Sequence, residues 1–146
     1  TFISSTFWTE RIGPTAALKT LEIMEREKSW KKISKTGEVI GKKWKSLAKI
    51  NSLPIILGGL NATINFTLPL KDWLKYKTLI TQEMLKNNIL AANAVYTCLA
   101  HKEKYVNEYF EKLKPIFSLI NECENGRSID DLLDGPISHD GFKRLN

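Results

Sequence analysis

Three adjacent hydroxyl side chains near the start of the chain, Ser4, Ser5 and Thr6, are the best candidates for binding an anion. Each hydroxyl can donate a hydrogen bond to a phosphate oxygen, and bonds to a charged acceptor are stronger than bonds between neutral groups. Gly13 and Pro14 follow closely and are typical of a helix start, since proline in the first turn loses no hydrogen bond. By themselves, three hydroxyls more often form a solvated turn, so this site needs support from the rest of the chain.

A second group of polar side chains lies in the loop expected over residues 92–100. Asn93 and Tyr96 carry an amide and a phenol there. An amide and a phenol can hydrogen bond to a small ligand, but a capped loop and an ordinary half-buried tyrosine explain them equally well. His101 precedes an expected helix without a carboxylate or nucleophile beside it in sequence, which favours a helix cap over a catalytic base.

The elements that must position these residues show two kinds of spacing. A three-four spacing of apolar residues predicts one helix from Pro14 to about residue 27 and a second, over residues 30–50, capped by Ser29. Trp30 and Trp44 lie on the apolar stripe of the second helix, and we expect both in the core. The same spacing predicts helices over residues 71–87 and 102–124.

Strand-like spacing occurs between these helices. Alternation predicts strands near residues 55–60 and 63–68, and a short apolar run predicts a third near 89–91. The order of elements predicts an α+β fold, in which helices cover one side of a small antiparallel sheet.

Composition excludes several classes of protein. The chain has 146 residues, enough for one domain with an appendage, and no apolar run that approaches the roughly 18 residues of a membrane span. We therefore expect a cytoplasmic protein without a membrane partner. Cys98 and Cys123 are too far apart to indicate a metal site or a disulfide framework.

The net charge of +6 arises from one segment. Residues 28–49 hold eight lysines and a single acid, Glu38. The lysines have no arginine partners and no interleaved glycine or aromatic pattern of a nucleic-acid-binding module, so a solvated helix face is favoured and no nucleic-acid partner is expected. The alternative is a non-catalytic α+β interaction module whose lysine-rich helix binds an acidic partner.

Three segments together resemble one enzyme family. The segment Ser4 to Leu18 resembles the phosphate-contacting segment of the class III pyridoxal-phosphate (PLP) aminotransferases, which include glutamate-1-semialdehyde aminomutase. Residues 90–101 resemble a strand, loop and helix start of their small domain, and residues 133–145 resemble the C-terminal end of a subgroup. Because these segments follow the order of the family, the resemblance implies the C-terminal part of a fold type I PLP enzyme. Residues 1–27 would be the end of the large domain and the connecting helix, and residues 28–146 the C-terminal small domain.

The resemblance also implies roles for individual residues. Ser5 and Thr6 would contact the phosphate of PLP in the neighbouring subunit of a homodimer, while Asn93 and Tyr96 would face a small amino-group donor or acceptor. The lysine that binds the cofactor would lie upstream of Thr1, so we expect no catalytic residue in this chain and no activity of the chain alone. The sequence departs from the commonest family pattern, in which Gly-Asn-Pro soon follows the threonine, because residues 8–11 intervene here.

Overall fold

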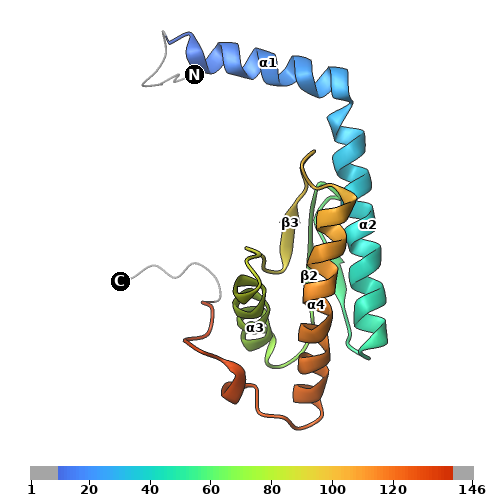
Figure 1. Cartoon of the computed structure of the whole chain (residues 1–146), viewed down its shortest axis with the longest axis vertical. Coiled ribbons are helices and arrows are strands. Elements are labelled where there is room, and N and C mark those ends of the chain that lie inside the picture. The colour runs from blue at the N-terminus through green and yellow to red at the C-terminus, as the bar shows by residue number, and fades with distance from the viewer. Residues whose placement is uncertain (1–9, 140–146) are drawn as a thin grey trace, which may run out of the picture.

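The structure is a computed structural model that describes residues 10–139. Along the chain, helices come before, between and after the strands of one small sheet (Figure 1). The elements are α1 (Ile12–Glu27), α2 (Ser29–Ile50), β1 (Ile56–Gly58), β2 (Thr63–Thr67), α3 (Trp73–Lys86), β3 (Ala94–Tyr96), α4 (Glu103–Glu124) and the short 3-10 helix η1 (Asp130–Leu132). The described part of the chain therefore has the α+β fold that its sequence predicts.

The break between α1 and α2 is a single residue. Lys28 adopts a left-handed conformation with φ of 49°, which ends α1 and redirects the chain into α2. As a result α1 runs away from the sheet (Figure 1), and none of its residues is buried within the described part of the chain. Leu18 and Leu21 on its apolar stripe are 70% and 61% exposed.

Two expectations for α2 were wrong. Ser29 does not cap the helix, because Lys28 occupies the cap position; the Ser29 side chain is buried and its hydroxyl has no partner among the described residues. Trp44 is fully buried as expected, but Trp30 is 45% exposed because the first turns of α2 extend beyond the sheet (Figure 1).

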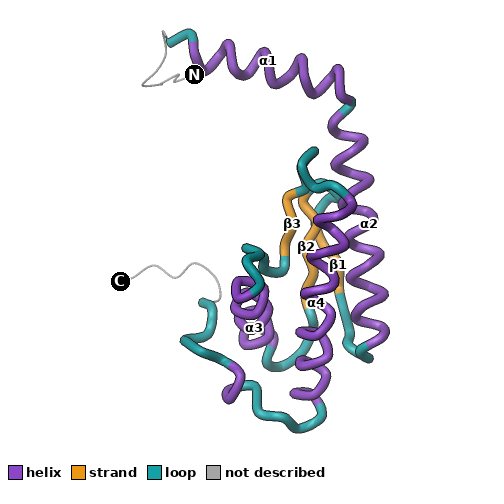
Figure 2. Tube along the Cα trace, viewed as in Figure 1, coloured by secondary structure: helices purple, strands orange, loops and turns teal. Residues whose placement is uncertain are grey.

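The sheet has three antiparallel strands in the order β1-β2-β3 (Figure 2). Alternation along β2 turns Ile64 and Phe66 toward the helices, where both are buried. Val95 of β3 pairs with Ile64 and shares this face. The buried residues of α2, α3 and α4 form one core with this inward face of the sheet.

The third strand lies at residues 94–96 rather than 89–91. Asn88 adopts a left-handed conformation, and the backbone N–H of Ile89 donates to the carbonyl of Met84. These are the features of a Schellman motif, in which the residue after the left-handed one returns its N–H to the helix. The apolar run at Ile89 therefore completes the end of α3, and β2 pairs with the next extended segment.

Gly37 allows α2 to lie against the turn between β1 and β2. A Cβ atom built on Gly37 would lie only 1.6 Å from the carbonyl oxygen of Asn61. The obstacle is backbone, which cannot rotate aside as a side chain does. Glycine at this position therefore fixes how closely α2 approaches the sheet.

We predict that Gly37→Ala lowers the free energy of unfolding by about 2 kcal/mol or more, because helix and turn must separate. Gly13→Ala is the matched control, since no atom of residues 10–139 lies within 4 Å of a Cβ there. In a helix this control is expected to be neutral or to stabilise by up to roughly 1 kcal/mol. Urea unfolding measures both, and equal stability of the two variants would contradict the close approach.

Candidate functional site

One face of the sheet is open. Ala94 and Tyr96 of β3 point away from the helices, as do their partners Asn65 and Thr63 of β2, because their neighbours along each strand point inward. Trp44, Trp73 and Phe117 of the helices contact the inward-facing Phe66. The described residues thus leave the outward face of β2 and β3 available to a partner or a ligand.

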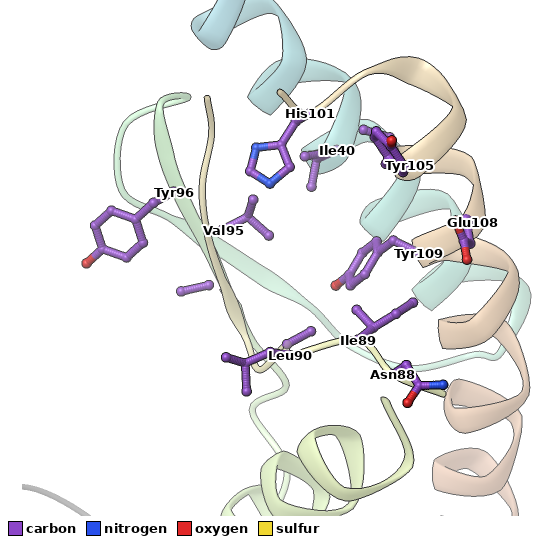
Figure 3. Close-up of a pocket in the computed structure, with 13 residues that line it drawn as sticks. Ile40, Asn88, Ile89, Leu90, Val95, Tyr96, His101, Tyr105, Glu108 and Tyr109 are labelled. Atoms are coloured by element: carbon purple, nitrogen blue, oxygen red, sulfur yellow. The ribbon is translucent and has the colours of Figure 1, made fainter. Parts of the chain in front are cut away.

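Tyr96 is the most prominent side chain on this open face. It is 77% exposed, so the reading of an ordinary half-buried tyrosine is wrong. Its ring points away from the helices (Figure 3), and the phenol has no hydrogen bond within residues 10–139. Tyr96 is therefore free to meet a ligand, and its contact with substrate stays a prediction.

Asn93 has a structural contact instead of a free amide. The side-chain Nδ2 of Asn93 donates to the backbone carbonyl of Phe66 at 2.9 Å, and the backbone carbonyl of Asn93 accepts from the Phe66 N–H at 2.9 Å. The residue thereby extends the pairing of β2 with β3 by one position. This geometry places Asn93 as an anchor of the strand that carries Tyr96, while a contact with substrate is untested.

Ser5 and Thr6 lie outside the described residues. Their predicted contact with a phosphate is therefore not tested by the structure.

A cavity that sequence reasoning missed lies between β3, the N-terminal half of α4 and the segment after α3 (Figure 3). Its volume is about 530 Å³. Apolar walls come from Ile40, Ile89, Val95 and Val106, and the polar side chains at its surface include Asn88, His101, Tyr105, Glu108 and Tyr109. The apolar spacing of α4 predicts that Val106 and Tyr109 face inward, but nothing in that spacing reveals unfilled space.

Tyr109 places a hydroxyl group in the wall of this cavity. Its Oη accepts a hydrogen bond of 3.0 Å from Nε1 of the fully buried Trp44. Burial raises the pKa of Tyr109 because the charged phenolate loses hydration, so the phenol stays protonated. Its proton has no acceptor among residues 10–139 and is available to donate.

His101 does not cap α4 as expected. Lys102 holds the cap position without a side-chain hydrogen bond, and His101 Nδ1 accepts the backbone N–H of Cys98 at 2.9 Å. In the neutral imidazole the proton then resides on Nε2. The ring lies over the cavity near Val95 (Figure 3), so sequence position alone gave the wrong role.

The lysine-rich face of α2 is partly neutralised by its own neighbours. Lys32 pairs with Glu27 at 2.9 Å, and Glu38 pairs with both Lys35 and Lys42. Hydrogen bonds from these lysines lower the pKa of Glu27 and of Glu38. Because the pairs are exposed, they contribute little to stability, as expected for a solvated helix face.

Within the described ranges, no three His, Cys, Asp or Glu side chains gather closely enough to hold a metal ion. Among the same residues, no helix has the length and apolar character needed to cross a bilayer. Cys98 and Cys123 are both free thiols.

Comparison with known proteins gives a similarity of fold. No protein-family model matches the chain. The structure is similar to the PLP internal aldimine form of the FumI protein of Sphingopyxis sp. MTA144, with a TM-score of 0.75 and 16% sequence identity. The match covers 88% of this chain and 31% of FumI, so the chain spans less than a third of that protein's length. It shows that this α+β unit has the fold of one part of a longer PLP protein.

We predict that Asn93→Ala lowers the free energy of unfolding by about 1–2 kcal/mol, because the carbonyl of Phe66 loses a donor in a half-buried site. Asn107→Ala is a suitable control, since Asn107 is exposed and its side chain accepts from Lys43. Its effect should stay within about 0.5 kcal/mol. Thermal or urea unfolding distinguishes them, and a neutral Asn93→Ala would remove its anchoring role.

Proposed function

We propose that the chain is the C-terminal part of a PLP-dependent aminotransferase or aminomutase of class III. The similarity to FumI over 88% of the chain is the observation that carries this proposal. The three sequence segments that resemble the family support it independently. In this assignment residues 1–27 are the end of the large domain and the connecting helix, and residues 28–146 are the small domain.

The exposure of α1 supports this division. A helix of 16 residues with no buried side chain gains little from packing, and isolated helices of this length are marginal in water. Its stripe of Leu18, Leu21 and Met24 requires an apolar surface beyond the described residues. A large domain of the same enzyme would supply that surface.

Cofactor binding in this proposal involves Ser5 and Thr6, whose hydroxyls donate to the phosphate of PLP held by the partner subunit of a homodimer. When bound, PLP supplies an electron sink for the carbanion formed at the substrate. The chain itself supplies phosphate binding, which retains and orients the cofactor.

Substrate binding in this proposal involves the open face of the sheet. Tyr96 presents a phenol that can hydrogen bond to a small amino-group donor or acceptor, and Asn93 fixes the strand from which it projects. The three-stranded sheet would thus form one wall of a cleft closed by the large domain.

We predict that Thr6→Val in the complete protein weakens PLP binding by about one to two powers of ten, because a hydrogen bond to the anionic phosphate is lost at constant side-chain shape. Thr6→Ser retains the hydroxyl and should bind PLP nearly as well as the native protein. Equilibrium titration with PLP measures the affinities.

A mixing experiment tests whether the contact crosses the subunit interface. Inactive Thr6→Val subunits, combined with subunits that lack the cofactor-binding lysine, should regain activity in heterodimers because one site then has both groups. Unchanged PLP affinity would contradict the phosphate contact, whereas verified heterodimers without activity would contradict the crossed geometry.

We predict that Tyr96→Phe in the complete protein raises KM for the amino substrate roughly three- to tenfold, because one hydrogen bond is lost. Unfolding and PLP affinity should not change, since the side chain is 77% exposed. Tyr105→Phe removes a hydroxyl from another exposed tyrosine and should leave KM unchanged. Steady-state kinetics decides, and equal KM values for the two variants would exclude Tyr96 from substrate binding.

A further inference from the structure

The cavity lies beside β3, and Ala94 and Tyr96 of the open sheet face contribute to its edge. The ring of Tyr96 points away from it, while Val95, the next residue along the strand, points into it (Figure 3). Its volume of about 530 Å³ lies within the range of roughly 300–1,000 Å³ that is usual for small-molecule sites. Because β3 is an edge strand, no further strand lies between the cavity and solvent among the described residues.

Tyr109 gives the cavity a fixed donor. The bond from Trp44 Nε1 occupies an acceptor position of the phenol oxygen and orients the ring, and the proton is left without an acceptor within residues 10–139. A ligand oxygen that accepts this proton forms a hydrogen bond that a ligand without such an oxygen lacks, so it gains affinity.

His101 gives a second donor at the mouth of the cavity. Its Nδ1 is occupied by the Cys98 N–H, which leaves Nε2–H as the group that faces a ligand. The side chains of Ile40, Ile89 and Val106 make the remaining wall apolar. Two donors above an apolar wall suit a molecule with one acceptor oxygen on a hydrocarbon body.

We propose that this cavity binds a small, uncharged aromatic or branched aliphatic molecule that carries a carbonyl oxygen, with Tyr109 and His101 as its donors. The carboxylate of Glu108 at the rim disfavours an anion, and the N–H of His101 and the O–H of Tyr109 disfavour a cation. Its two donors, Tyr109 and His101, are distinct from the predicted phosphate contact at Ser5 and Thr6, although Tyr96 of the proposed substrate face also lines the cavity.

A pair of probes of equal shape tests the proposal. Acetophenone has a carbonyl oxygen where α-methylstyrene has a methylene group. In an NMR titration of the 146-residue chain, acetophenone should shift the backbone N–H of Val95 and the indole N–H of Trp44 in a saturable manner. The indole of Trp30, remote from the cavity, is the internal control. Absence of saturable shifts at Val95 and Trp44 would overturn the proposal.

Variants test the role of the oxygen. Tyr109→Phe should weaken acetophenone binding roughly two- to tenfold and leave α-methylstyrene binding unchanged, because only the ketone loses a hydrogen bond. Asn107→Ala, on the same helix but outside the cavity lining, should affect neither probe. His101→Phe provides a second test that keeps the Trp44–Tyr109 bond intact, and it should again weaken only acetophenone. An equal change for both probes in these variants would overturn the proposed donors.

Discussion

The side chain of Phe66 contacts an aromatic ring from each of the three helices that cover the sheet. Its ring centroid lies 4.7 Å from that of Trp44 in α2, 5.9 Å from that of Trp73 in α3 and 5.9 Å from that of Phe117 in α4. Phe66 is itself fully buried on the central strand. Aromatic pairs at these separations add stability beyond the area they bury. The relative positions of the helices therefore depend on one residue of β2.

This contact divides the sheet into two different faces. Because side chains alternate along a strand, the packing of Phe66 toward the helices turns Asn65 and Thr67 outward. The same register turns Val95 inward and Tyr96 outward across β3. The side chains of Val95 and Tyr96 thus point to opposite sides of one short strand, and a change of register by one residue would exchange them.

The edge position of β3 explains why space is left beside it. Helix packing is concentrated around Phe66, and β3 lies one strand farther from α2. Asn93 and Thr97 secure its two ends: the Asn93 amide donates to Phe66, and the Thr97 hydroxyl lies 3.0 Å from the carbonyl of Ile33 in α2. The strand is therefore held in place at its ends while a volume beneath its middle stays open.

The sequence by itself determined the helices, the first two strands and the α+β class, because apolar spacing in those segments is local and regular. It did not determine β3, since the run at Ile89 is as apolar as a strand, and only the return of its N–H to Met84 makes it a helix end. It also predicted helix caps at His101 and Ser29 that the structure does not contain. A residue that caps a helix and one that lies next to the cap look the same in sequence. Exposure of Trp30, the cavity at Tyr109 and the open face at Tyr96 were decided by tertiary structure alone, since each depends on which segments lie adjacent after packing.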